Sequence, residues 1–503
     1  MKKGLTCGLF WSSFWVALSA QTFNKRYDPY GLDLYGFAFS VEIIDPGSQL
    51  IVFYNAGWQD TIYYSSVLGT LLLSDAGLPL DTTEYFVPLN ATYNGWSDAS
   101  FKRANGSYVV GGSIRGQDEI HYPAVFFFSA QGNPDSLFAM SELDGWIGRH
   151  TVETFNGNYL LCGERSNGND LDGFLIKLSP TGNTLWTWSG GGGSADYATS
   201  VGESSDSKYY MGGAKEFSSS NIDFWVKAFD TSGQPLWDTI WGSPYLESVA
   251  YVRIASDGGL LVAGGFGISA GNNKVKYIAK LNHEDGSPIW ERFYGPGGYD
   301  GALLSLKELP SGDLIGTGTH VLGVVDYTGV LLRTTSEGDS LWMRYYYYED
   351  SITTNGRGIF RDVEPTPDGG FVAVGSAFSD ANYSQDVWVV KVDQHGCIEP
   401  GCHLITGMET QITNMRDVLR VWPNPVHAEG QVQVQLVLPE TFVPQGDLRI
   451  TVTSSDGRLV HEEAVYNSST TSTLQLPQLT PGLYHIHLCD ASRWISGAKL
   501  VVE

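Results

Sequence analysis

The sequence predicts an all-β protein, a seven-bladed β-propeller followed by a small C-terminal β-sandwich. Composition is the first reason: 60 glycines, 13% aromatic residues and only 17% charged residues suit short strands joined by tight turns. Length is the second, because a chain of 503 residues is too long for one compact core. The third is a unit of about 51 residues, set by two series of glycines, that recurs along most of the chain.

Residues 1–20, MKKGLTCGLFWSSFWVALSA, combine two lysines, a short apolar stretch and small residues before Gln21. This pattern predicts a secretory signal peptide rather than a membrane span, with cleavage after Ala20 or after Ser19. No other segment is long and apolar enough to span a bilayer. We therefore expect an exported mature protein without a transmembrane segment.

The formal net charge is -25, and loss of Lys2 and Lys3 with the leader makes it -27. Affinity for phosphate backbones and for anionic membranes depends on lysine and arginine. The charge therefore excludes nucleic acid and anionic membrane surfaces as partners.

Two series of glycines define the repeat. The first ends an aromatic-apolar run, and the first copy, at 50–54, lacks it; its members are Gly112, Gly163, Gly213, Gly264, Gly318 and Gly375. The second lies in the turn after the next apolar run; its members are Gly77, Gly132, Gly182, Gly233, Gly286, Gly338 and Gly396. Both series count seven copies, which places the propeller at 21–403.

Each copy contains four apolar runs bounded by glycine turns. In the fifth copy these runs are 248–255, 260–264, 275–281 and 289–294. Four strands in about 51 residues, seven times over, is typical of a propeller, whose blades are four-stranded sheets. The glycine-rich segments between copies, such as YGPGGYD, are interpreted as connectors.

The last copy offers only three strands, at 358–364, 371–375 and 387–392. At the other end of the chain, TFNKRY at 22–27 resembles the fourth strand of the fifth copy, ERFY. We therefore predict that the mature N-terminus supplies the missing strand of the last blade, which closes the ring and removes two sheet edges.

Four tryptophans lie four residues after a turn glycine: Trp186, Trp237, Trp290 and Trp342. Their regular spacing favours packing between neighbouring blades over a sugar-stacking role, because a ligand site does not need one equivalent residue in every blade. The turn FDTSGQPLW at 229–237 looks like the tryptophan-docking motif of quinoprotein-type propellers. That resemblance implies the fold; the quinone and calcium ligands of such dehydrogenases cannot be assigned in this sequence.

Cys397 and Cys402 bracket the turn-forming insert Ile-Glu-Pro-Gly. An exported protein meets oxidising conditions, so the two cysteines are predicted to form a disulfide. A metal site that uses His403 is the alternative, but it lacks a second pair of ligands at usable spacing.

The repeat stops after His403, and 404–417 reads as a polar linker. Alternating apolar residues and an Asp-Gly turn then predict a small antiparallel β-sandwich at 418–503.

This C-terminal segment also resembles the C-terminal sorting domain of the type IX secretion system. Four motifs in the right order carry the resemblance; their residues are Pro423, Asn424, Pro425, Asp456, Gly457, Arg458, Gly482, Tyr484 and Lys499. The resemblance implies Sec export, passage across an outer membrane with the type IX machinery as partner, and removal of the domain with release or surface attachment.

Paired carboxylates, Ser/His/Asp sets, Cys/His sets and phosphate loops do not stand out, so we assign no catalytic residue, no cofactor site and no metal site. Asn169, Asp170 and Asp172 supply oxygen atoms that suit calcium, although a turn explains them equally well. The run Tyr345, Tyr346, Tyr347 and Tyr348 is a candidate patch for a glycan or protein ligand.

Two functions follow. We expect a secreted or cell-surface binding or scaffold protein rather than an enzyme, with a glycan or a protein as ligand. The alternative is an extracellular hydrolase or lyase that degrades polysaccharide or peptide. Clustered carboxylates with shifted pKa at the channel mouth favour the enzyme.

Overall fold

A computed structural model describes most of the chain. The described residues are 22–28, 35–44, 49–59, 64–85, 96–116, 120–168, 170–322, 326–348, 357–378, 385–399, 401–402, 411–412, 418–427, 431–438, 447–454, 458–465, 471–490 and 493–503. They form strands and turns without an α-helix, so the predicted all-β class is confirmed. The predicted signal peptide lies outside the described residues.

Consecutive strands pair antiparallel in groups of four. Group one is β2 (Tyr35–Ile44), β3 (Gln49–Gln59), β4 (Tyr64–Ser74) and β5 (Pro79–Tyr85). Group two is β6 (Ser100–Lys102), β7 (Tyr108–Arg115), β8 (His121–Phe128) and β9 (Pro134–Ala139). Group three is β10 (Trp146–Glu153), β11 (Tyr159–Asn167), β12 (Asp170–Leu178) and β13 (Thr184–Gly190). Group four is β14 (Asp196–Glu203), β15 (Tyr209–Ser218), β16 (Asn221–Phe229) and β17 (Pro235–Trp241).

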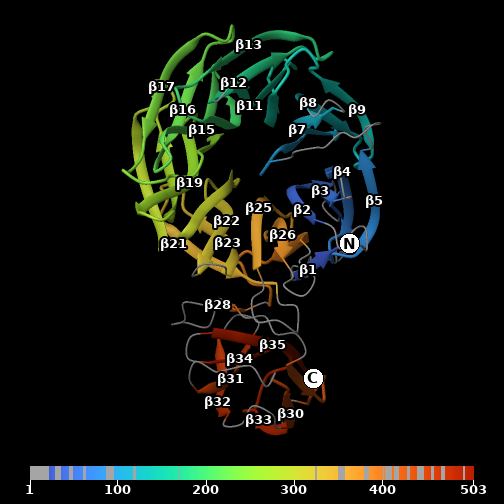
Figure 1. The fold of residues 1–503 in the computed structure, drawn as a ribbon. Coiled ribbons are helices and arrows are strands. Elements are labelled where there is room, and N and C mark those ends of the chain that lie inside the picture. Colours follow the sequence, from blue (N-terminus) through green and yellow to red (C-terminus); the bar gives the residue numbers. More distant parts are fainter. Residues whose placement is uncertain are drawn as a thin grey trace, which may run out of the picture.

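The remaining groups follow the same order. Group five is β18 (Tyr251–Ile254), β19 (Leu260–Ser269), β20 (Asn273–Leu281) and the first part of β21 (Pro288–Glu308). Group six is the second part of β21 with β22 (Leu314–Leu322), β23 (Asp326–Thr334) and β24 (Ser340–Tyr346). Group seven is β25 (Arg357–Pro365), β26 (Phe371–Phe378), β27 (Gln385–Val392) and β1 (Phe23–Tyr27). The groups succeed one another around a ring (Figure 1).

Two elements differ from the sequence-based expectation. The YGPGGYD segment belongs to one long strand, β21, because its residues continue to pair: Gly298 lies opposite Lys274 of β20, and Tyr299 opposite Val321 of β22. The first strand of the fifth copy is shorter than 248–255, since β18 begins at Tyr251.

Neighbouring groups meet at a repeated contact, which we call the seam. At six of the seven seams a turn glycine with positive φ lies against an aromatic ring on the outer strand of the preceding group; at the other seam, Gly132 meets Ile51 of β3. A Cβ on Gly233 would be 2.8 Å from Trp186, and one on Gly286 would be 2.6 Å from Trp237. Gly338 and Gly396 meet Trp290 and Trp342 in the same way. The tryptophans therefore pack between groups, as their spacing predicts.

The N-terminal strand takes part in the same contacts. β1 pairs antiparallel with β27, from Phe23 opposite Lys391 to Tyr27 opposite Val387. The ring of Phe23 lies 2.8 Å from the place of a Cβ on Gly77, the turn glycine of group one. The Tyr27 hydroxyl donates to the Gly77 carbonyl at 2.8 Å. β1 thus joins group seven to group one through the contacts that join the other groups.

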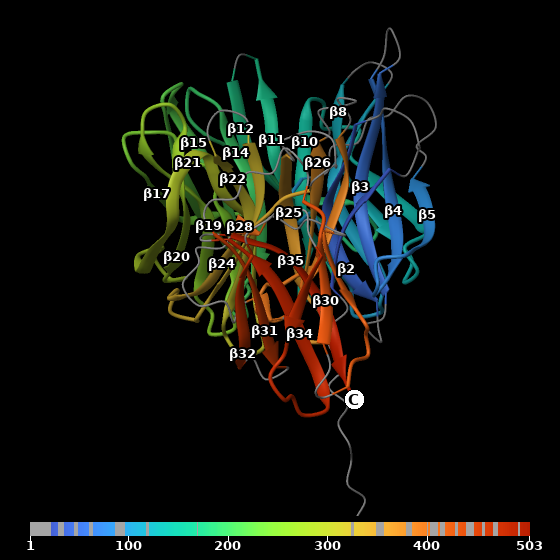
Figure 2. The ribbon, with the colours of Figure 1, turned by 90° about the horizontal axis from the view of Figure 1, so that it is seen from below.

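The C-terminal strands form two sheets around one apolar core. One sheet holds β29 (Leu419–Trp422), β30 (Gln431–Leu436) and β33 (Thr471–Gln475). The other holds β31 (Leu448–Ser454), β32 (Leu459–Val465), β34 (Gly482–Cys489) and β35 (Arg493–Val502). Val432 and Val434 of the first sheet share the core with Ile450 and Ile486 of the second. Figure 2, drawn from below the view of Figure 1, shows this unit in front of the ring.

The predicted linker contributes a short strand of its own. β28 (Gln411–Ile412) pairs in parallel with β24 at Tyr345 and with β35 at Arg493 and Trp494. It therefore continues the sheet of group six into the C-terminal unit.

Candidate functional site

Ionisable side chains gather at the centre of the ring, where the first strands of the groups approach one another. We call this set the central charge cluster; its members are Glu42, Asp98, His150, Arg253, Lys307, Asp362 and Glu364. They come from or next to β2, β6, β10, β18, β21 and β25, six different first strands. Group four adds the Val201 amide, which donates to His150 Nδ1 at 3.3 Å.

Lys307 links three acids of this cluster. Its Nζ donates to Asp98 Oδ1 at 2.9 Å and to Glu364 Oε1 at 2.6 Å, and it lies 3.7 Å from Asp362 Oδ1. The second oxygen of Asp98 accepts a hydrogen bond from the Arg253 guanidinium. One ammonium and one guanidinium therefore neutralise acids from groups two and seven at the same point.

Hydroxyl groups satisfy the remaining carboxylate oxygens. Asp362 accepts hydrogen bonds from Ser40 Oγ at 2.8 Å and from Ser305 Oγ at 3.0 Å. Ser100 Oγ donates to Glu42 Oε1 at 3.0 Å. Since these donors belong to groups one, two and six, the cluster ties distant parts of the chain together.

The environment of the cluster shifts the pKa of its members. Burial, helped by the nearby Glu364 charge, raises the pKa of Glu42 to about 8, and burial with the Asp98 charge raises the pKa of Asp362 to about 7. Burial also disfavours ionised Asp98, but Arg253 and Lys307 outweigh it and hold the pKa of Asp98 well below its usual range. Burial and the Arg253 charge lower the pKa of His150 to about 3.

Carboxyl groups that titrate near neutrality next to a lysine are the groups that proton-transfer chemistry uses. The accessibility of these groups is uneven. Asp362 and Asp98 are 0% and 1% exposed, and their oxygens already accept bonds from within the chain. The side chains of Arg253, Lys307 and Glu364 retain 22%, 20% and 19% exposure, so the cluster meets solvent mainly through these three residues.

A second set of side chains lies one to five residues before cluster members in the sequence. We call it the aromatic-arginine rim; its members are Phe37, Trp96, Arg149, Tyr251 and Arg361, one from each of five groups. Arg149 Cζ lies 3.7 Å from the centre of the Trp96 ring, and Trp96 Nε1 donates to the Tyr251 hydroxyl at 2.9 Å. Arg361 Cζ lies 4.8 Å from the centre of the Phe37 ring. The rim thus combines aromatic rings with two guanidinium groups.

The tyrosine run that the sequence singles out packs against other parts of the chain. Tyr346 is 1% exposed, and its hydroxyl donates to the Gly396 carbonyl at 2.7 Å. Tyr345 pairs with β28, the Tyr347 carbonyl accepts a bond from Asn24, and the Tyr348 ring lies 6.0 Å from Arg26 Cζ. The ligand patch at this run stays a prediction.

The oxygen-rich turn proposed for calcium is only partly within the described residues, because Asn169 lies outside them. Asp170 and Asp172 belong to β12, and Asp172 lies 3.4 Å from Arg165 in an ion pair. A calcium ion at this turn stays a prediction.

Another group of possible metal ligands in the described part of the chain is Asp206, His283 and Glu284, whose ligand atoms lie within 4.8 Å of one another. Lys208 Nζ lies 2.9 Å from Asp206 and 2.6 Å from Glu284, so a lysine already neutralises these acids.

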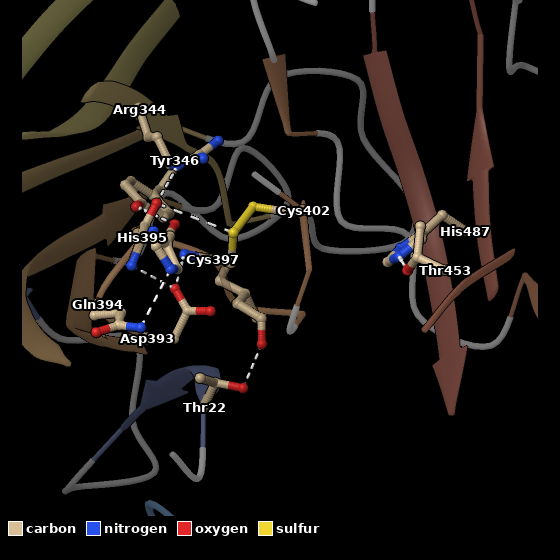
Figure 3. Close-up of a disulfide and its surroundings, with 12 residues drawn as sticks. Thr22, Arg344, Tyr346, Asp393, Gln394, His395, Cys397, Cys402, Thr453 and His487 are labelled. Atoms are coloured by element: carbon tan, nitrogen blue, oxygen red, sulfur yellow. Dashed lines mark hydrogen bonds between the residues drawn. A yellow bond between two sulfur atoms is a disulfide. The ribbon is translucent and has the colours of Figure 1, made fainter. Parts of the chain in front are cut away.

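The predicted disulfide between Cys397 and Cys402 is confirmed, with Cα atoms 5.6 Å apart (Figure 3). Asp393 Oδ1 accepts the amide hydrogens of His395 and Cys397, both at 2.8 Å, and thereby shapes the turn before the bridge. The Thr22 hydroxyl donates to the Ile398 carbonyl inside the disulfide loop. The loop therefore holds the start of β1.

The motifs of the C-terminal unit contact one another. Asn424, between Pro423 and Pro425, donates through Nδ2 to the Lys499 carbonyl at 2.7 Å and accepts the Val501 amide at 2.9 Å. In the other motifs, Tyr484 donates to the Thr480 carbonyl at 2.8 Å, Gly482 begins β34, and the Arg458 carbonyl accepts the Ser454 amide. Asp456 and Gly457 lie outside the described residues.

Comparison with known proteins identifies this unit. Residues 420–503 match the family described as "Secretion system C-terminal sorting domain". The chain therefore carries a type IX sorting domain and is secreted by that system to the cell surface or the extracellular space. Among the residues that the structure describes, no helix is long and apolar enough to cross a bilayer.

No curated protein matches the chain. Solved structures similar to it include Drosophila Semaphorin 2a, with 8% identity, a TM-score of 0.44 and coverage of 96% of this chain and 98% of that one. Polysaccharide lyase Uly1 has 9% identity, a TM-score of 0.42 and coverage of 75% and 98%. Sqt1 from Chaetomium thermophilum has 11% identity, a TM-score of 0.39 and coverage of 71% and 85%. Similarities this low carry no argument about activity.

Proposed function

We propose that residues 22–402 form a closed seven-bladed β-propeller that serves, after type IX secretion, as a binding or scaffold module. Each of the seven four-stranded groups is one blade in this proposal. The repeated seam supports it, because Gly77 meets Phe23 as Gly233 meets Trp186. Pairing of β1 with β27 supports closure of the ring.

The aromatic-arginine rim is the observation that carries the binding function. Five side chains from five blades converge there, and both rings and guanidinium groups are present. Ligand sites combine apolar walls with a few convergent polar groups. The central charge cluster lies next to the rim, and its ion pairs are made within the chain, so it gives the rim a rigid base. The ligand in this proposal is a glycan or a protein.

The test exposes the purified secreted protein to a glycan array and to cell-surface extracts, with a panel of hydrolase and lyase substrates alongside. We expect captured ligands and no turnover. Trp96→Ala removes the ring beneath Arg149 and should weaken capture at least about tenfold. Phe155→Ala is the matched control, because Phe155 is an exposed aromatic residue at 74%. Capture that both variants retain would reject the rim as the site.

A second candidate is a hydrolase or lyase, and one observation favours it. Glu42, Asp362 and Glu364 all have a raised pKa, and they surround Lys307. Turnover in the substrate panel that Glu364→Gln abolishes, with unchanged thermal stability, would make the charge cluster the active site. Turnover that this variant leaves intact would point to contamination or to another site.

A further inference from the structure

Arg361 differs from the other arginines at the centre of the ring. Arg253 pairs with Asp98, and Arg149 pairs with Glu164 through Nη2 and Oε1 at 2.6 Å. For Arg361 no acidic partner is found within the described residues, and its Nε is buried without a hydrogen-bond partner. Its neighbours are the Phe37 ring and Tyr251.

A buried guanidinium without a counter-charge is costly, because the lost hydration is not replaced. Burial accordingly lowers the pKa of Arg361, and only the electrostatic effect of Tyr251 opposes this. Arg361 immediately precedes Asp362, but the oxygens of Asp362 accept bonds from Ser40, Val41 and Ser305. The Nε–H of Arg361 therefore has no acceptor among the described residues.

We propose that the aromatic-arginine rim binds the carboxylate of an acidic sugar and that Arg361 is the residue that recognises it. This inference rests on the proposed binding function and names the ligand class for the same site. The planar guanidinium fork matches the two oxygens of a carboxylate, and charge-assisted bonds of this kind are the strongest available to a side chain. The partly exposed Phe37 ring beside it suits the uncharged remainder of a sugar ring, while the buried Tyr251 supports the site from beneath.

The charge of the whole protein restricts the ligand further. A net charge of -25 repels a polymer with many acidic groups. One carboxylate at a chain end meets that repulsion only once, whereas a fully acidic polymer meets it at every residue. The site therefore suits one terminal sugar acid on an otherwise neutral glycan.

The test titrates the secreted protein with sodium glucuronate, with glucose as the neutral match, acetate as the bare carboxylate and a short peptide ending in glutamate. We expect glucuronate to bind more tightly than the other three. Arg361→Gln should weaken glucuronate binding by about tenfold or more and leave glucose unchanged. Arg361→Lys should give an intermediate loss, since it keeps the charge without the fork. Arg292→Gln is the control, because Arg292 also lies over an aromatic ring, Trp290, but on an outer strand.

Thermal unfolding separates recognition from a structural role. Removal of an unpaired buried charge should leave the Tm of Arg361→Gln equal to or above that of the parent protein. A lower Tm with unchanged glucuronate affinity would overturn the proposal, and so would preference for the peptide. If the parent protein and Arg361→Gln capture neutral glycans equally well, the acidic-sugar ligand is rejected and the proposed binding function stands. If the parent protein captures no ligand at all, both the acidic-sugar ligand and the binding function are rejected.

Discussion

The seams at the outside of the ring and the charge cluster at its centre hold the same groups together in opposite ways. Every seam repeats one contact, a turn glycine beneath a side chain of the preceding group, as in Gly286 beneath Trp237. In the cluster no two groups contribute the same set of residues: Lys307 comes from group six alone, and Arg253 from group five alone. Contacts that every copy repeats build the ring. Residues that differ between copies are the ones that can serve a specific role.

The largest expected effect distinguishes a central lysine from an outer one. Lys307→Met should lower the free energy of unfolding by roughly 3–5 kcal/mol, because Asp98, Asp362 and Glu364 lose their shared cation. Lys280→Met breaks only the pair with the exposed Asp257 and should cost less than about 1 kcal/mol. Denaturant titration of both variants measures the difference. If both variants lose the same free energy of unfolding, the central ion pairs stabilise the fold no more than the outer pair does.

A smaller effect tests whether the seam needs glycine for space or only for its backbone. Gly286 has φ 72°, and an added Cβ would meet Thr239 Oγ1 and lie 2.6 Å from the Trp237 ring. Gly157 has φ 77° and nothing within 4 Å of an added Cβ. Gly157→Ala should cost about 1 kcal/mol from backbone strain alone, whereas Gly286→Ala should cost about 2–4 kcal/mol. If the two losses are alike, ring packing at the seam does not limit the side chain.

The smallest expected effect is a change with pH in the stability that Glu42 contributes at the centre of the ring. Burial raises the pKa of Glu42 to about 8 in the folded chain, whereas the ordinary pKa of 4.5 applies in the unfolded chain. Between these values the folded state binds more protons, so the contribution of Glu42 to stability falls as pH rises. Glu42→Gln should match the parent near pH 5 and exceed it by about 1–3 kcal/mol at pH 8.

Thermal melts of parent and variant across that range measure this contribution. His150 acts in the opposite sense below its ordinary pKa, because burial holds it neutral. Both proteins contain His150, so its effect cancels in their difference. Glu291→Gln, at an exposed position of β21, is the control. A pH-independent difference for Glu42→Gln would contradict the raised pKa.

The sequence predicts the strands and the seams because both depend on local pattern. A turn glycine and the tryptophan four residues later stand in the same place in several copies, and the structure joins them to neighbouring groups as expected. The long strand β21 was not predicted, since glycine and proline in YGPGGYD indicate a connector and only its pairing with β20 and β22 makes it a strand.

The centre could not be predicted in the same way. Ser40 and Asp362, which share a hydrogen bond, are 322 positions apart, and no local pattern relates them. A signal was nevertheless present in the alignment of the copies. Glu42, Arg253 and Lys307 occupy equivalent places in their copies. Each lies opposite the residue of the next strand that stands three positions before the first glycine series, at position 54, 264 or 318. This position of the repeat holds an acid, an arginine and a lysine in different copies, and such a change of charge at one position indicates a role beyond building the ring.

The N-terminal strand has one more consequence. β1 is made first but pairs with β27, which ends at Val392, so it has no partner until nearly the whole ring exists. In the proposed propeller, the ring can therefore close only after β27 has been made, because β1 supplies the outer strand of the last group. A mechanical pull on the N-terminus would break the pairing of β1 with β27 before it reached any other strand. A chain that lost residues 22–27 would expose the edge of β27 to a neighbouring molecule.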